Sequence, residues 1–142
     1  MAQVTFAHPT SSTPLYGIGN TSTIVVTKDI NITAQETNAR FINGDRYFSR
    51  PVSGSCWILL KSARQNDSVI KAGTRFSITK ITNRSSDNGF RDDNFTTRIY
   101  VHSLTISDFG CYRSGNTPTV GYFQQEFGDN VTIENGEADV LQ

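Results

Sequence analysis

CWILL, residues 56–60, is the most apolar segment of the chain and decides the predicted fold. Five successive apolar side chains leave no polar face, so we expect a central strand with both faces covered. The only two cysteines are Cys56, at the start of this segment, and Cys111, which follows two further apolar runs. We therefore predict an all-β fold, an antiparallel β-sandwich closed by a Cys56–Cys111 disulfide, with Trp57 on the opposite side of its strand from Cys56.

Alternating side chains predict a half-buried strand at residues 74–81, because Phe76 and Ile78 point to one side and the polar residues between them to the other. Residues 98–106 predict another strand. The β-branched run 23–27, the aromatic-rich run 120–127 and the alternating run 130–134 are also expected to be extended. A short N-terminal edge strand is expected at residues 3–6.

An Asn43-Gly44 pair lies between two short apolar runs and predicts a β-hairpin. Both turn positions of a type I′ hairpin need positive φ, and Asn and Gly tolerate it best. Residues 83–94 form the most polar segment, which predicts a long exposed loop.

The length of 142 residues fits one domain, residues 1–142. The formal net charge is zero and the pI is about 6.7, so we expect no nucleic-acid partner. No apolar run approaches the roughly 20 residues that span a bilayer, and the start of the chain lacks the pattern of a signal peptide. We expect either a cytosolic protein or a mature exported chain to which Met1 was added.

Asn, Ser, Thr and Gly are abundant, a composition common in exported β-proteins. A disulfide persists in oxidising compartments, so the predicted pairing favours a periplasmic, cell-surface or extracellular protein. The alternative is a pair of buried free thiols in a cytosolic protein. Six N-x-[ST] sequons, at Asn20, Asn31, Asn66, Asn83, Asn94 and Asn130, would be glycan sites in a eukaryotic or viral protein, and polar turns in a bacterial one, which we favour.

The predicted 83–94 loop is the main candidate for ligand binding, since loops on a rigid sandwich often carry binding sites. Its amide, carboxylate, guanidinium and aromatic side chains suit hydrogen bonding to a sugar and stacking on it. Together with an aromatic group near the second cysteine, the candidate residues are Asn88, Phe90, Arg91, Asp92, Asp93, Tyr112 and Tyr122. Calcium bound by Asp87, Asp92 and Asp93 and a plain solvated loop are the alternatives, although the spacing differs from that of an EF-hand.

Catalytic residues are scarce. His102 and Ser103 are adjacent, and neighbouring residues of a strand point to opposite faces, so they cannot act as base and nucleophile. Asp92 and Asp93 are also adjacent, which suits no glycosidase geometry. We predict no enzyme, no cofactor and no metal centre.

Two stretches resemble known exported domains. Asp108, Gly110 and Tyr112 keep the spacing of the D-x-G-x-Y turn of immunoglobulin domains, and residues 75–79 are similar to one of their strands. Residues 69–73, the following alternating strand, the polar loop and Ile99-Tyr100 resemble the end of the lectin domain of type 1 fimbrial adhesins. These resemblances imply an immunoglobulin-like, adhesin-type sandwich.

Two functions follow as expectations. The first is a non-enzymatic exported module that binds a glycan or a protein through its loops. The second is an assembly subunit of a fibre, pilus or capsid, a homo-oligomer whose edge strands pair with neighbouring copies.

Overall fold

The structure is a computed structural model, which describes residues 10–48, 54–86 and 94–134. Its strands are β1 (Thr23–Val26), β2 (Ile30–Ile32), β3 (Asn38–Ile42), β4 (Asp45–Tyr47), β5 (Gly54–Leu60), β6 (Ser68–Ile70), β7 (Arg75–Ser86), β8 (Asn94–Val101), β9 (Ile106–Ser114) and β10 (Val131–Glu134). Its helices are η1 (Leu15–Gly17), α1 (Val120–Phe127) and η2 (Gly128–Asn130).

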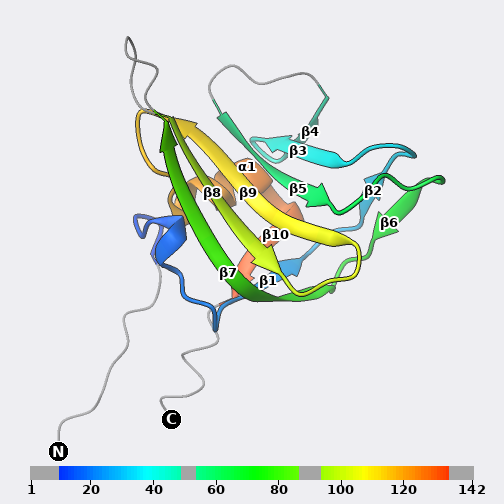
Figure 1. The fold of residues 1–142 in the computed structure, drawn as a ribbon, viewed down its shortest axis with the longest axis horizontal. Coiled ribbons are helices and arrows are strands. Elements are labelled where there is room, and N and C mark those ends of the chain that lie inside the picture. Colours follow the sequence, from blue (N-terminus) through cyan, green and yellow to red (C-terminus); the bar gives the residue numbers. More distant parts are fainter. Residues whose placement is uncertain (1–9, 49–53, 87–93, 135–142) are drawn as a thin grey trace, which may run out of the picture.

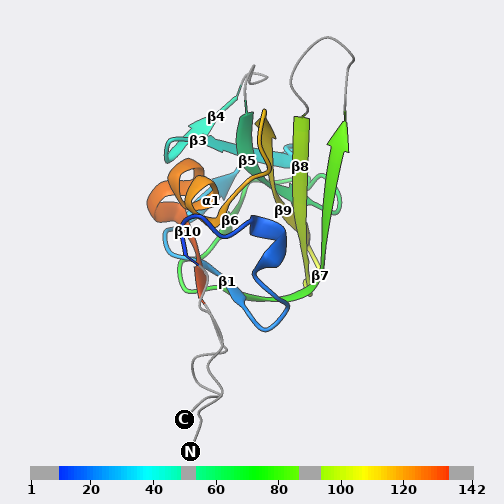
Figure 2. The ribbon, with the colours of Figure 1, turned by 90° about the vertical axis from the view of Figure 1, so that its left-hand side faces the viewer.

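Eight strands form one continuous antiparallel sheet in the order β10-β1-β7-β8-β9-β5-β3-β4, and β2 pairs with β6 separately. The large sheet curls, and α1 lies on the inner side of the curl (Figure 1 and Figure 2). The prediction of a mostly antiparallel β-protein with one disulfide is confirmed. A sandwich of two facing sheets is not, because one hydrogen-bonded sheet supplies the curved wall and a helix covers its inner side.

Strand β5 is central, between β9 and β3, as its apolar sequence predicted. Cys56 lies directly opposite Cys111 in the register, their Cα atoms are 4.0 Å apart, and the disulfide is formed. Trp57 and Leu59 are only half-buried, so the second face of β5 is less covered than expected.

The core lies between the inner face of the sheet and α1. Phe109 on β9 and Phe127 on α1 lie at its centre, with ring centroids 6.3 Å apart, and both are fully buried. Phe41, Phe76 and Phe123 extend this aromatic cluster at centroid distances of 4.6 to 5.3 Å.

The prediction of a strand at residues 120–127 is wrong, because these residues form α1. The Thr119 hydroxyl accepts a hydrogen bond from the Tyr122 amide and caps the helix, and Gly128, with a φ of 60°, follows its end. Val120, Phe123 and Phe127 have the three- and four-residue spacing of one helix face. That spacing, and not the aromatic content, decides the local structure.

The Asn43-Gly44 hairpin is confirmed, with φ of 52° and 87° at the two residues. Its turn lies against the end of α1. The Gly44 amide donates to the Glu126 carbonyl, and the Asn130 amide nitrogen donates to the Gly44 and Phe127 carbonyls at 2.9 and 2.7 Å.

Phe76 and Ile78 are buried between exposed residues, as predicted for β7. Two neighbouring boundaries differ from the sequence-based prediction. Both ends of the loop expected at 83–94 belong to strands, because β7 continues through Ser86 and β8 begins at Asn94; residues 87–93 lie outside the described residues. The strand expected at 98–106 is broken, because the Ser103 hydroxyl accepts from the amides of Thr105 and Ile106 and fixes a turn between β8 and β9.

Residues 29–33 contribute β2, which pairs with β6. Asp108, Gly110 and Tyr112, which keep the spacing of the immunoglobulin turn, lie within β9. The N-terminal strand predicted at residues 3–6 lies outside the described residues.

Candidate functional site

The face of the sheet that points away from α1 is the main candidate surface. We define the outer face as the side chains of β5, β7, β8 and β9 on that side: Ser55, Trp57, Leu59, Lys80, Thr82, Arg84, Asn94, Thr96, Arg98, Tyr100, Asp108, Gly110 and Tyr112. Directly paired residues of antiparallel strands share a face, so the register places these residues in rows that cross the four strands. One row consists of Thr82, Arg98, Gly110 and Trp57.

Trp57 lies across Gly110. A Cβ at Gly110 would be 2.5 Å from two carbons of the indole and 2.8 Å from its Nε1, so the ring occupies the space that a side chain would fill. The glycine therefore lets the indole lie against the sheet. Trp57 is half-buried, so the residue is not fully covered by the rest of the described structure.

A groove of about 860 Å³ lies next to this row, over β7 and β8. This volume is within the usual range for small-molecule sites. Hydroxyl, amide, guanidinium and phenol groups line it, from Thr82, Arg84, Ser85, Asn94, Thr96, Arg98 and Tyr100. None of these described lining residues is acidic.

Asp108 lies at the floor of the outer face, opposite Tyr100 on β8 and Leu59 on β5. It is 0% exposed, and neither carboxylate oxygen has a hydrogen-bond partner with good geometry among the described residues. Burial raises the pKa of Asp108, whereas the nearby Ser107 hydroxyl, the Arg98 charge and the Trp57 indole lower it in part. The net direction is upward, which favours the neutral acid in the fold.

The opposite end of the Asp108 row carries a cation. Lys80 lies over the Tyr100 ring, with its Nζ 4.8 Å from the centroid. A cation in this position is attracted to the negative face of the ring. The contact holds the phenol ring beside the groove.

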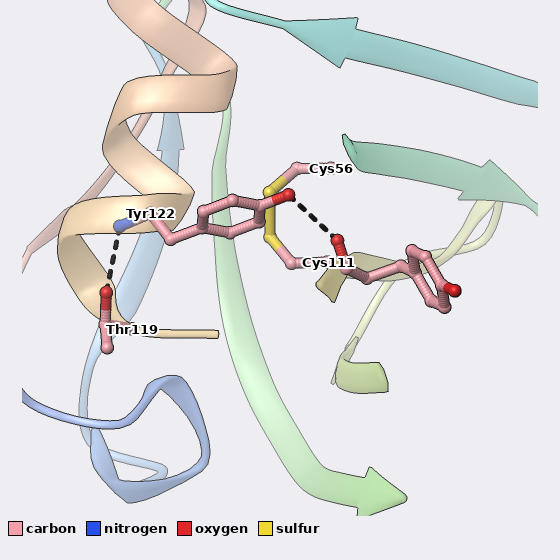
Figure 3. Close-up of a disulfide and its surroundings, with 5 residues drawn as sticks. Cys56, Cys111, Thr119 and Tyr122 are labelled. Carbon is pink, nitrogen blue, oxygen red and sulfur yellow. Dashed lines mark hydrogen bonds between the residues drawn. A yellow bond between two sulfur atoms is a disulfide. The ribbon is translucent and has the colours of Figure 1, made fainter. Parts of the chain in front are cut away.

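Of the residues predicted to bind ligand, Tyr112 belongs to the outer face. Tyr122 lies on α1, on the other side of the sheet, where its hydroxyl donates to the Tyr112 carbonyl at 2.9 Å (Figure 3). Arg113 lies 5.0 Å from the centre of the Tyr122 ring, and burial raises the pKa of Tyr122 to about 12. The structure therefore does not bring the two tyrosine side chains together. Phe123, which follows Tyr122 on α1, is fully buried.

Glycine at position 54 belongs to the same contact. Its φ is 151°, and a Cβ there would overlap the Tyr122 hydroxyl and lie 2.6 Å from the Tyr112 carbonyl oxygen. Gly54 thus makes room for the hydrogen bond that ties α1 to β9 beside the disulfide (Figure 3).

Five other predicted ligand-binding residues, Asn88, Phe90, Arg91, Asp92 and Asp93, lie outside the described residues, as does the calcium candidate Asp87. In the described ranges no group of three His, Cys, Asp or Glu side chains is arranged to hold a metal ion. His102 is exposed, and the Ser103 hydroxyl is occupied by two backbone amides.

Six outer-face residues were not predicted from the sequence as site residues: Trp57, Thr82, Arg84, Thr96, Arg98 and Gly110. Their signal is the alternation of polar side chains along 82–84 and 94–100, and the two-residue spacing of Asp108, Gly110 and Tyr112. These patterns identify a face of each strand. Which faces meet depends on pairings between distant segments, which no local pattern contains.

Comparison of the chain with protein-family models, with curated proteins and with solved structures finds no match. No helix in the described part of the chain is long and apolar enough to cross a membrane. The class of the protein is thus defined by its own geometry, a curled antiparallel sheet with one internal disulfide and a polar, aromatic outer face.

Proposed function

We propose that the protein is a carbohydrate-binding module, and that the outer face of β5, β7, β8 and β9 is its binding surface. The observation that carries this proposal is the Trp57 indole lying across Gly110, beside the polar groove. A sugar ring has an apolar C–H face and a rim of hydroxyls. An open aromatic ring suits the first, and clustered amide, hydroxyl and guanidinium groups suit the second.

The rows of the register support this proposal. Neighbouring strands lie about 4.8 Å apart, so Thr82, at one end of the central row, is roughly 15 Å from Trp57 at the other. A short oligosaccharide that crosses the strands can therefore stack on the indole and reach the groove. Rigid strands hold these groups in place without a loop that must first become ordered.

The alternative, assembly through edge strands, has less support. β10 is one edge of the large sheet, and the Gln124 amide donates to its Val131 carbonyl at 3.1 Å. This carbonyl is therefore already occupied, which makes β10 a poorer template for a further strand.

Because disulfides persist in oxidising compartments, we place the binding function outside the cytosol. The resemblance to immunoglobulin-like adhesin domains stays a prediction. The surface proposed here lies on strands and does not require it.

The test uses Trp57, the only tryptophan of the chain, as its own reporter. We expect that a panel of oligosaccharides contains at least one that shifts or quenches the Trp57 emission in a saturable way. Gly110→Ala should displace the indole and weaken that binding about tenfold or more. Gly17→Ala is the matched control, since a Cβ there meets only the Thr13 methyl at 4.0 Å. The proposal would be contradicted if no oligosaccharide in the panel changed the Trp57 emission, or if the Gly110→Ala variant bound as tightly as the natural protein.

A further inference from the structure

We infer that the ligand is an acidic saccharide, and that its carboxylate or sulfate group binds between Arg84 and Arg98 in the groove. This inference rests on the proposed carbohydrate-binding function and adds the chemical class of the ligand.

The register brings the two arginines together. Arg84 pairs with Thr96, and Thr82 pairs with Arg98, so the two arginines are diagonal neighbours on one face of the β7–β8 hairpin. Diagonal neighbours of this kind are about 7–8 Å apart, within reach of long side chains. Both arginines line the groove, so an anionic group bound there lies within reach of both side chains.

Guanidinium groups are suited to this role, because their N–H groups match the two oxygens of a carboxylate or of a sulfate. Thr82 and Thr96 sit beside them in the same two rows and supply hydroxyls for the rest of the sugar. The groove therefore combines a charged anchor with neutral polar groups.

The described charges around the groove favour an anion. Arg84, Arg98 and Lys80 all lie on the outer face, whereas the one acidic residue among those that define it, Asp108, is buried. Burial raises the pKa of Asp108, although the nearby Arg98 charge lowers it in part. Two neighbouring guanidinium ions repel each other, and an anion between them removes that repulsion.

A nucleic acid is the less favourable anionic partner. Its affinity comes largely from many phosphate contacts that release counterions, and the whole chain has a formal net charge of zero. Two arginines in one groove suit a ligand with isolated charges better.

The experiment titrates the intact protein with three probes while Trp57 emission is recorded: trigalacturonic acid, its methyl ester, and a chondroitin sulfate tetrasaccharide. We expect at least one acidic probe to bind about tenfold or more tightly than the neutral ester, with affinity that falls as salt rises. Binding of the first probe assigns a carboxylate ligand. Chondroitin sulfate carries both carboxylate and sulfate groups, so binding of the third probe alone assigns a ligand that needs its sulfate.

Arg84→Gln and Arg98→Gln should each weaken binding of the acidic probe about tenfold or more. Arg64 is exposed in the loop before β6, and Arg64→Gln, which removes the same charge there, should leave binding unchanged. Arg98→Lys keeps the charge and loses the forked geometry, so it should fall between Arg98→Gln and the natural protein. Thermal unfolding of each variant verifies that it is folded.

Two results would overturn the inference in different ways. If neither acidic probe binds more tightly than the neutral methyl ester, the ligand is not acidic, and the carbohydrate-binding proposal is left intact. Tighter, arginine-dependent binding of a single-stranded oligonucleotide, with no response to any saccharide, would overturn both.

Discussion

The two faces of β9 differ in what they do for the molecule. Its inner side chains, Phe109 and Cys111, are fully buried in the core and the disulfide. Its outer positions, Gly110 and Tyr112, form part of the polar, aromatic outer face. Because side chains alternate along a strand, one nine-residue segment serves stability with one face and remains free for recognition with the other.

The largest effect on stability is expected when a large side chain is removed from the inner face of β9. Phe109→Ala leaves a cavity among Phe76, Phe127 and their neighbours, and should lower the free energy of unfolding by about 3–5 kcal/mol. Tyr112→Ala, on the outer face of the same strand, is the control and should cost much less. Urea unfolding of both variants measures the difference, and equal losses would show that the two faces are not divided in this way.

Removal of the disulfide has the next largest expected effect. The link joins residues 55 positions apart, so the double variant Cys56→Ala/Cys111→Ala should lose about 2–4 kcal/mol, because its unfolded chain is less restricted. Urea unfolding measures the loss. Carbohydrate binding under native conditions should be retained, since both sulfur atoms lie on the inner face. A loss of binding in a variant that is still folded would argue against a separate outer site.

Tyr122→Phe tests the residue that the sequence assigned to the ligand and the structure places against the backbone of β9. The substitution removes the hydrogen bond to the Tyr112 carbonyl and should lower the free energy of unfolding by about 1 kcal/mol. Probe affinity should stay unchanged. If affinity falls while stability does not, Tyr122 belongs to the binding site after all.

The smallest effect is expected at Asp108. This residue belongs to the outer face of β9 but is buried like the residues of the inner face, so it fits neither description fully. Its pKa is raised from 3.8, so the folded state holds the proton more tightly than the unfolded state does. The Asp108 contribution to stability is therefore best below pH 3.8 and declines as the pH rises through the raised pKa. Asp108→Asn should flatten this decline and slightly raise the stability at neutral pH, because the buried side chain can no longer ionise.

Thermal unfolding across pH 3 to 8, roughly the range over which a raised carboxyl pKa acts, compares the variant with the natural protein. An unchanged pH dependence would mean that Asp108 is ionised and compensated in the fold.

Local chemistry makes part of this fold predictable. The positive φ angles of Asn43 and Gly44 need those two residue types, and the alternation around Phe76 and Ile78 requires a strand with one buried face. The disulfide could be predicted because only two cysteines occur and each lies in an apolar run.

Other features depend on information that is not local. The aromatic content of α1 concealed a helix that its Thr119 cap and Phe123–Phe127 spacing specify. The meeting of Trp57 with Gly110 requires β5 and β9 to pair in one register, and a slip of one residue would turn Trp57 to the other face. The candidate site could therefore not be assembled from the sequence, although each strand carried its part of the pattern.

The docking of the β3–β4 turn on the end of α1 has a consequence for biosynthesis. Asn130 is the acceptor of an N-x-[ST] sequon, yet its amide nitrogen donates to the carbonyls of Gly44 and Phe127. A glycan attached to that nitrogen would occupy the position where the turn and the helix meet. In a glycosylating host, glycan transfer to Asn130 would thus compete with the packing of the β3–β4 turn on α1. A host without that machinery imposes no such competition.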